Sequence, residues 1–209
     1  MQALSPNAVR WAPGDGDRVG LAALNRLAMG VVVVDEAARI LFANTAGPRI
    51  LAERDGLLAS GSDSCRASIA SETAALHGLV TRACADSMLE DEASGIALTR
   101  PSQKRPLIVL VAAEQANASP RRAIIFVLDP ERQVLPQAET ISRLFTLSPM
   151  EGKLVRGLAE GKKLEAVAQD LEITLSTART YLKQAFSKTG TGRQSELLKL
   201  VLTASGIDA

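Results

Sequence analysis

The sequence predicts an α+β chain, in which an antiparallel sheet with helices is followed by an all-α domain of four helices. Two patterns and the chain length carry this prediction. Apolar, β-rich runs occur through the first two thirds of the chain, at 31–34, 40–43, 95–99, 107–112 and 123–128. From residue 137 onward, apolar residues recur at the three-to-four spacing of helices. The length of 209 residues allows one large domain or two small ones.

The composition excludes several protein classes. Hydrophobic residues make up 46% of the chain and charged residues 22%, which is ordinary for a globular protein. No apolar run approaches the roughly 20 residues that a membrane helix needs. The first ten residues also lack the basic-then-apolar order of a signal peptide. We therefore expect a cytoplasmic protein that has no membrane partner.

The elements of the N-terminal domain can be placed in chain order. Pro and Gly residues indicate a flexible arm over 1–20, and apolar spacing predicts a short helix at 21–28. The next expected elements are a hairpin, a short helix, a loop, a long helix and three strands, at 31–43, 44–51, 59–64, 67–88, 95–99, 107–112 and 123–128. This order predicts a five-stranded antiparallel sheet with helices on one face, within a domain over 21–129.

Capping signals place the helices of the C-terminal part. Residues 130–146 are expected to form a linker helix, and a separate domain should occupy 147–209. Ser148, Pro149 and Glu151 form the pattern of a capping box at the start of its first helix. Gly161 should end that helix. The next three helices are expected at 163–171, 175–188 and 193–203, the second of them capped by Thr174.

Two of these helices, joined by the tight turn 172–174, form a helix-turn-helix. In such a unit the second helix enters the major groove of DNA. The net charge of the chain, +1, does not by itself indicate a nucleic-acid partner. Residues 174–195, however, carry four cationic side chains and no acidic one. The outward face of this helix should present hydroxyl, cationic and amide groups that suit bases and phosphates: Ser176, Thr177, Arg179, Thr180, Lys183 and Gln184.

The C-terminal motifs resemble the LuxR-type DNA-binding domain. The similarity runs without gaps over roughly 145 to 203, through Leu147-Ser148-Pro149-Met150-Glu151, Leu171-Glu172-Ile173-Thr174 and Thr177-Ala178-Arg179-Thr180-Tyr181-Leu182-Lys183. Tyr181 stands where that family commonly has His, and Glu172 stands where Gly is frequent. Gly157, inside the first helix, should cost about 1 kcal/mol relative to Ala. These departures do not change the four cations of residues 174–195.

The resemblance implies partners and contact residues. It implies a homodimer that binds double-stranded DNA at two half-sites, with RNA polymerase as a further candidate partner. The implied base and backbone contacts are Thr177, Arg179, Thr180 and Lys183, and the implied phosphate contacts are Lys188 and Arg193. The implied dimerisation residues lie in the fourth helix at Leu197, Leu198 and Val201.

The N-terminal domain resembles a PAS sensor domain. Residues 30–44, Gly-(Val)4-Asp-Glu-Ala-Ala-Arg-Ile-Leu-Phe-Ala-Asn, are similar to the opening strands of that fold. The resemblance implies a PAS-like domain that senses a signal or mediates dimerisation, with a small molecule as candidate ligand. A phosphoacceptor receiver domain is the alternative. It fits less well, because Asp86 falls in a helical pattern and the strands do not alternate with helices.

We expect neither a cofactor nor a metal. Cys65, Cys84 and the single His77 are too few for a zinc site of cysteine and histidine ligands. The stretch Ser64-Cys65-Arg66-Ala67 departs from the Asn-Cys-Arg-Phe of flavin-binding PAS relatives. His77 is the one candidate for a haem ligand, although a lone His on a helix is more often structural.

Three classes of function follow for comparison. The leading hypothesis is a transcription regulator whose DNA-binding domain is masked. The N-terminal sheet or the linker helix would cover its fourth helix until a signal frees that helix to dimerise. The alternative is a protein-interaction module or anti-regulator that uses a helix-turn-helix without binding DNA. An enzyme is not expected, because the sequence holds no clustered carboxylates, phosphate-binding loop or Gly-x-Ser-x-Gly.

Overall fold

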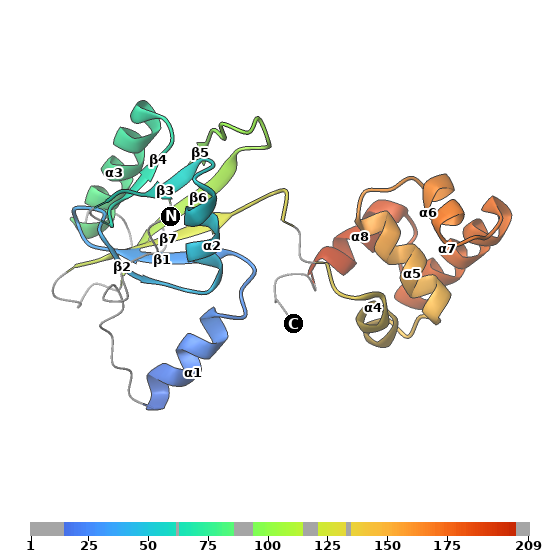
Figure 1. Ribbon diagram of the computed structural model, residues 1–209. Coiled ribbons are helices and arrows are strands. Elements are labelled where there is room, and N and C mark those ends of the chain that lie inside the picture. The colour runs from blue at the N-terminus through green and yellow to red at the C-terminus, as the bar shows by residue number, and fades with distance from the viewer. Residues whose placement is uncertain (1–14, 62, 86–93, 115–120, 133–134, 204–209) are drawn as a thin grey trace. The chain divides into compact units, whose positions relative to one another are not determined.

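The computed structural model of the chain describes residues 15–61, 63–85, 94–114, 121–132 and 135–203 (Figure 1). The chain divides into two compact units, Met1–Gln133 (unit 1) and Val134–Ala209 (unit 2). Unit 1 contains an antiparallel sheet and unit 2 is helical, so the α+β class predicted from the sequence is confirmed. Among the described residues, no helix has the length and apolar character needed to span a bilayer.

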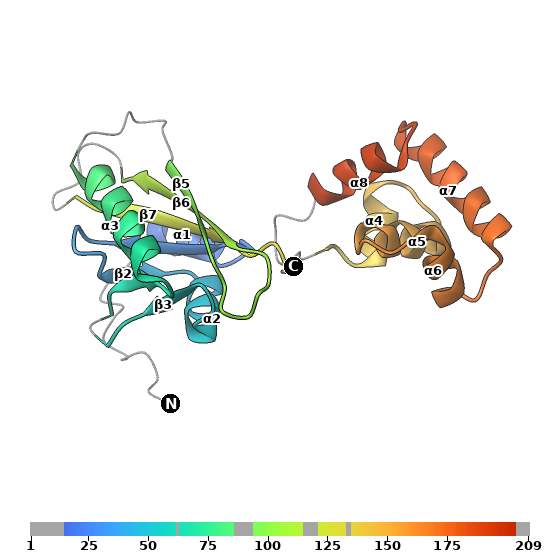
Figure 2. The same cartoon turned by 90° about the horizontal axis from the view of Figure 1, so that it is seen from above.

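Unit 1 is built on a five-stranded sheet with the order β2-β1-β7-β6-β5, in which every neighbouring pair is antiparallel. The strands are β1 (Gly30–Val34), β2 (Ile40–Ala43), β5 (Ser94–Leu98), β6 (Leu107–Ala113) and β7 (Ala123–Leu128). One face of the sheet is covered by α2 (Ala46–Glu53), α3 (Ala70–Cys84) and a small ribbon of β3 (Leu57–Ala59) and β4 (Cys65–Ala67), as Figures 1 and 2 show.

Strand alternation decides which side chains form the core of unit 1. Because successive residues of a strand point to opposite faces, every second side chain faces the covering helices. Val32, Val109 and Ile125 are fully buried in this way, on β1, β6 and β7. They pack with Leu76 and Val80 of α3 in one apolar cluster. The other side chains of the same strands point away from the helices.

Asn44 is a buried polar side chain that joins α1 (Asp15–Leu24) to the sheet. Its Oδ1 accepts hydrogen bonds from the backbone N–H groups of Val31 and Gly47, at 2.9 and 3.1 Å. Its Nδ2 donates to the carbonyl oxygens of Leu24 and Met29, at 2.8 and 3.0 Å. Each polar atom of this amide therefore has two partners, which compensates for its burial.

Unit 1 departs from the predicted elements at three places. Residues 15–20, expected in the flexible arm, begin helix α1, which ends at Leu24 rather than at residue 28. The loop expected at 59–64 is flanked by the ribbon strands β3 and β4, which are too short to show a period in sequence. Helix α3 starts at Ala70 rather than at residue 67. The arm over 1–14 and the expected end of the long helix at 86–88 lie outside the described residues.

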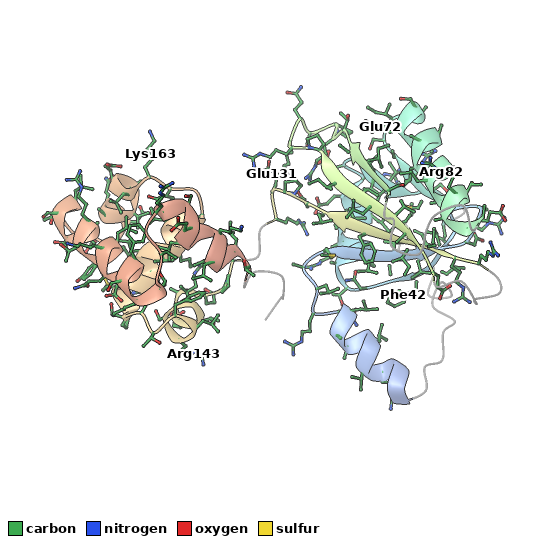
Figure 3. The ribbon with its side chains drawn as sticks, turned by 180° about the vertical axis from the view of Figure 1, so that it is seen from behind. Phe42, Glu72, Arg82, Glu131, Arg143 and Lys163 are labelled. Atoms are coloured by element: carbon green, nitrogen blue, oxygen red, sulfur yellow. The ribbon has the colours of Figure 1, made fainter. Side chains whose placement is uncertain are left out.

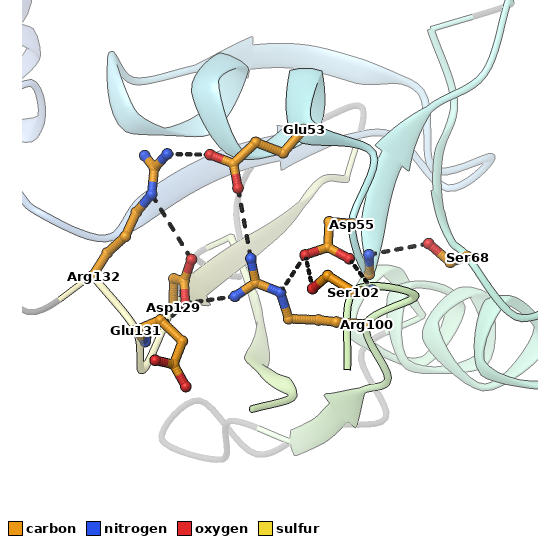
Figure 4. A network of polar contacts seen from close by, with 9 residues as sticks. Glu53, Asp55, Ser68, Arg100, Ser102, Asp129, Glu131 and Arg132 are labelled. Atoms are coloured by element: carbon orange, nitrogen blue, oxygen red, sulfur yellow. Dashed lines mark hydrogen bonds and ion pairs between the residues drawn. The ribbon is translucent and has the colours of Figure 1, made fainter. Parts of the chain in front are cut away.

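A network of ion pairs lies where the chain leaves β7 (Figure 4). The side chain of Arg100 is only 1% exposed, and its Nε and Nη1 each lie 2.7 Å from a carboxylate, of Asp55 and Asp129 respectively. Glu53, at the end of α2, adds a third carboxylate and also pairs with Arg132. Since Asp129 directly follows β7, this network fixes the first residues of the connection towards unit 2.

Unit 2 contains five helices within its described residues. They are α4 (Ala138–Leu144), α5 (Pro149–Ala159), α6 (Leu164–Asp170), α7 (Leu175–Thr189) and α8 (Gln194–Thr203). The segment expected as a linker helix contains α4, which packs on α5 inside this unit and contributes the fully buried Ile141 to its core. The capping box of Ser148 and Glu151 is confirmed, as is the cap formed by Thr174.

Two glycines of α5 allow neighbouring helices to approach closely. A Cβ placed on Gly152 would collide with the hydroxyl of Ser142 and would lie 2.7 Å from the carbonyl oxygen of Ala138 in α4. A Cβ on Gly157 would lie 2.9 Å from a methyl carbon of Val167 in α6. The loss of helix propensity expected for Gly157 is therefore accompanied by tight packing between α5 and α6.

Candidate nucleic-acid interface

Helices α6 and α7 form a helix-turn-helix around a buried apolar contact. The backbone leaves α6 at Leu171 and enters α7 through residues 172–174. The hydroxyl oxygen of Thr174 accepts a hydrogen bond from the backbone N–H of Thr177 at 3.2 Å, which fixes the start of α7. Val167 and Ala168 of α6 pack against Ala178 of α7 in one buried cluster. This packing orients the opposite side of α7 towards solvent.

The solvent face of α7 carries polar and cationic side chains at helical spacing. Its exposed members are Ser176, Arg179, Thr180, Lys183, Gln184, Ser187 and Lys188. The buried side is marked by Ala178 and Ala185, both 0% exposed. Leu175–Thr189 contains no acidic residue, so no carboxylate within this helix opposes an approaching phosphate. A helix of this length spans about 22 Å, and its diameter matches a major groove roughly 12 Å wide.

The expected cations differ in whether they are paired within the chain. Arg179 and Lys183 form no ion pair with any of the described residues, and the same holds for the exposed Arg193 before α8. Lys188 is different, because its Nζ lies 2.7 Å from Oε2 of Glu151 at the start of α5. The charges most available to a polyanion are thus those of Arg179, Lys183 and Arg193.

The pair of Glu151 and Lys188 joins α7 to the scaffold helix α5. The Glu151 side chain is 3% exposed and that of Lys188 is 40% exposed. Burial by itself would raise the pKa of Glu151, but the hydrogen bonds from Lys188 and from the Ser148 backbone N–H outweigh it, so the pKa is lowered. Glu151 also completes the capping box, which means that one carboxylate fixes two parts of the fold.

The hydroxyl groups near the start of α7 already have partners inside the helix. Thr174 Oγ1 lies 2.8 Å from the hydroxyl of Thr177 and 2.9 Å from that of Ser176. The Thr180 hydroxyl donates to the carbonyl oxygen of Ser176 at 3.1 Å. Thr177 is half-buried, whereas Ser176 and Thr180 are exposed. Of the expected contact residues, Thr177 is therefore the least accessible, and it acts in the structure mainly as part of the cap.

The dimerisation residues expected on α8 lie mostly within unit 2 in this structure. Leu197 and Val201 are both 0% exposed and pack with Ile141 and Val155 in the core of unit 2. Leu198 is half-buried and contacts the same cluster. The apolar stripe of α8 therefore contributes to the core of this unit. Sequence periodicity shows that such a stripe is covered, and it does not show which surface covers it.

The turn before α7 explains one departure from the LuxR-type pattern. Glu172 has φ of 54°, a left-handed conformation that glycine adopts without steric cost. The Gly that is frequent at this place in the LuxR-type pattern suits a positive φ, and Glu172 adopts the same positive φ here. Gly190, at the other end of α7, has φ of 67° and caps the helix, as its position after the last helical residue predicts.

Two further polar residues belong to the candidate surface and were not among those expected. Ser187 is exposed on α7 four residues after Lys183, so helical spacing alone could have added it. Lys163 is exposed directly before α6, where its side chain points away from the helices (Figure 3). It forms no ion pair among the described residues. A cation near the start of the first helix of a helix-turn-helix is placed to contact the DNA backbone. The sequence pattern of α7 does not point to Lys163, because this residue precedes α6.

The candidate cofactor residues of unit 1 lie at and beneath α3. Cys65 is 0% exposed, and burial raises the pKa of its thiol to about 12. A ring nitrogen of His77, Nε2, lies 2.9 Å from the carbonyl oxygen of Cys65 and so is within hydrogen-bond distance of it. Cys84 is also buried, and burial raises its pKa. In the described part of the chain, no three His, Cys, Asp or Glu side chains are grouped to hold a metal.

Comparison with known proteins gives weak structural likenesses. No family model matches the sequence, and no curated protein matches it. Among solved structures, VqmA bound to DPO has 16% identity and a TM-score of 0.36, covering 90% of this chain and 86% of that one. The phage VqmA-DPO complex has 14% identity and a TM-score of 0.36, with coverages of 90% and 89%. The Vibrio cholerae VqmA-ligand-DNA complex has 16% identity and a TM-score of 0.37, with coverages of 92% and 88%. At these low identities and TM-scores, the function has to be inferred from the residues of this chain.

Proposed function

We propose that the chain is a sequence-specific DNA-binding regulator of transcription. The observation that carries the proposal is the solvent face of α7, where Arg179 and Lys183 stand without an internal acidic partner among the described residues. Guanidinium and ammonium groups pair with phosphates and with guanine edges, and the neighbouring Gln184 amide suits adenine. A helix whose outer face serves only solvation generally mixes both signs of charge.

Unit 1 supplies the regulatory half in this proposal. Its PAS-like resemblance, at residues 30–44, indicates signal sensing or dimerisation, with a small molecule as candidate ligand. The masking of α8 expected from the sequence has to be recast, because Leu197 and Val201 are already covered by the core of unit 2. Control by unit 1 would then act on how two copies present their α7 helices, rather than on uncovering an apolar stripe.

Selection from a randomised duplex library tests the DNA-binding proposal. The full chain is compared with an Arg179→Ala/Lys183→Ala variant and with a Glu165→Ala/Gln169→Ala control, which alters exposed positions of α6. We expect the full chain and the control to enrich a two-fold symmetric motif and the double variant to lose it. Enrichment that persists in the double variant would place DNA recognition elsewhere. No enrichment by the full chain would favour a protein-interaction module.

A further inference from the structure

The connection between the two units is held at its unit 1 end by the ion-pair network around Arg100. Asp129, the first residue after β7, pairs through Oδ1 with Nη1 of the buried Arg100 at 2.7 Å. Its Oδ2 lies 3.8 Å from Nε of Arg132. Arg132 also pairs with Glu53 at the end of α2 (Figure 4). The chain is therefore fixed to unit 1 as far as Arg132.

Local contacts fix the backbone of the same segment. Oδ1 of Asp129 accepts a hydrogen bond from the backbone N–H of Glu131 at 2.9 Å. The carbonyl oxygen of Asp129 accepts one from the backbone N–H of Arg132 at 3.0 Å. Between them, the ring of Pro130 holds φ at about −65°. Residues 129–132 therefore form a restrained turn at the edge of unit 1.

The unit 2 end of the connection begins at Leu135. This side chain is half-buried and packs against the apolar cluster that contains Ile141 and Val155. Two residues later, Oε1 of Gln137 accepts a hydrogen bond from Nη1 of Arg156 in α5 at 2.7 Å. The carbonyl oxygen of Gln137 accepts the backbone N–H of Ile141 at 3.0 Å, in the first turn of α4. The chain is therefore fixed to unit 2 from Leu135 onward.

Two residues, Gln133 and Val134, separate these fixed ends in the sequence, and the division between the units falls between them. Because successive Cα atoms are about 3.8 Å apart, those of Arg132 and Leu135 can be separated by at most about 11 Å. This limit follows from covalent geometry, whatever conformation the two residues adopt. It restricts how far the α7 helix of each copy can move away from its own unit 1.

We propose that this short connection fixes the distance between the two DNA half-sites that a pair of copies recognises. The inference rests on the proposed function, which requires two copies to read a two-fold symmetric site. Each base pair added between half-sites moves one of them by about 3.4 Å and turns it by about 34°. Long flexible linkers would let the two α7 helices follow such changes. Connections of two residues do not provide that reach.

Arg132 and Glu53 are positioning residues in this proposal, since they set the length of the connection and contact no DNA. The side chain of Arg132 is 45% exposed, so Arg132→Gln removes its ion pairs without opening the core. Asp129 keeps its pair with Arg100 in that variant. The stretch that can extend then becomes 130–134, and the largest separation of its flanking Cα atoms, in Asp129 and Leu135, rises to about 23 Å.

The test measures the affinity of the full chain for duplexes built from the motif that the library selection returns. The spacer between the half-sites is shortened or lengthened by one to five base pairs. Wild type is compared with Arg132→Gln and with a variant that carries Gly-Ser-Gly-Ser inserted between Gln133 and Val134. The insertion adds about 15 Å to the reach of the connection. A duplex with a single half-site reports whether unit 2 of each variant still recognises DNA.

Two matched controls alter unit 1 away from the connection. The same Gly-Ser-Gly-Ser insertion is placed between Lys104 and Arg105, which are both exposed in the turn before β6. Arg122→Gln removes a partly exposed ion pair, with Glu114, that takes no part in the network around Arg100. Thermal unfolding of every variant reports whether the fold is retained.

We expect wild type and both controls to lose about tenfold or more in affinity when the spacer changes by two base pairs, and the insertion variant to lose less than about threefold. Arg132→Gln should fall between them, and all should bind the single half-site equally. A wild type that binds every spacer equally would overturn the inference and leave the DNA-binding proposal standing. An insertion variant that keeps the wild-type spacing preference would do the same. No enrichment by wild type in the library selection would overturn both.

Discussion

Nζ of Lys188 lies 2.7 Å from Oε2 of Glu151, so the last turn of α7 is tied to the first turn of α5. The carboxylate belongs to a nearly buried side chain and also accepts the Ser148 backbone N–H at 2.7 Å. One charged group therefore fixes the entry of the scaffold helix and the far end of the candidate DNA-contacting helix. Of the four cations in residues 174–195, Lys188 therefore has an ion-pair partner within the chain.

Lys188→Met should lower the stability of unit 2. Removal of the ammonium group leaves the Glu151 carboxylate without its strongest partner, at a cost of about 1–3 kcal/mol in the free energy of unfolding. The matched control is Ser187→Ala, which alters the neighbouring exposed position. Denaturant unfolding followed by circular dichroism measures both. Equal stability of the two variants would show that the ion pair contributes nothing measurable.

The salt dependence of DNA binding should separate Lys183 from Lys188. Each phosphate neutralised by a protein cation adds about 0.9 to the slope of log affinity against log salt. Lys183→Ala should therefore reduce the slope by about 0.9, because this ammonium has no ion-pair partner among the described residues. Lys188→Ala should reduce it by less, because Glu151 already neutralises that charge. Titration of a selected duplex at several salt concentrations checks this, and identical slope changes would contradict it.

Gly152→Ala should destabilise unit 2 although alanine is the better helix former. The added methyl group would meet the Ser142 hydroxyl and the Ala138 carbonyl oxygen of α4, and overpacking of this kind costs about 1–3 kcal/mol. Gly78→Ala in α3 is the matched control, since nothing lies within 4 Å of the added Cβ. It should stabilise unit 1 by up to about 1 kcal/mol. Thermal melting of both variants tests whether the first change lowers stability and the second raises it.

Asp55 should make unit 1 sensitive to acid. The pKa of this carboxyl is lowered from 3.8 to about 2, first by the hydroxyl and backbone N–H of Ser102 and then by the Arg100 guanidinium. Because the folded-state pKa lies below the unfolded value, the stabilisation is present above pH 3.8 and is lost as the pH falls towards about 2. Asp55→Asn should therefore lose less stability over that interval than wild type.

Urea unfolding of unit 1 within the full chain, repeated as the pH is lowered, measures this difference. Glu36→Gln serves as the control, because it removes an exposed carboxylate outside the network around Arg100. The control should follow the wild-type pH dependence. If Asp55→Asn follows it as well, the network around Arg100 does not set the acid sensitivity.

Local signals in the sequence determined much of unit 2 and of its candidate site. The Ser148–Glu151 capping box, the Thr174 cap and the Gly190 stop act through backbone groups a few residues away, so their positions could be read directly. The outward placement of Arg179 and Lys183 follows from helical periodicity, because Ala178 and Leu182 mark the opposite side. The five long strands of unit 1 also followed from alternation and apolar runs.

Only the tertiary structure decided which partners those surfaces meet. Leu197 and Val201 lie on an apolar stripe whose covering, α4 and α5 of the same unit, comes from residues far along the chain. The ion pair of Lys188 with Glu151, 37 residues apart, and the row that joins Val31 to Phe126 and Leu110 are likewise long-range. Periodicity specifies that a face is apolar or charged. What lies against that face depends on how distant segments pack, and a local pattern carries no information about that.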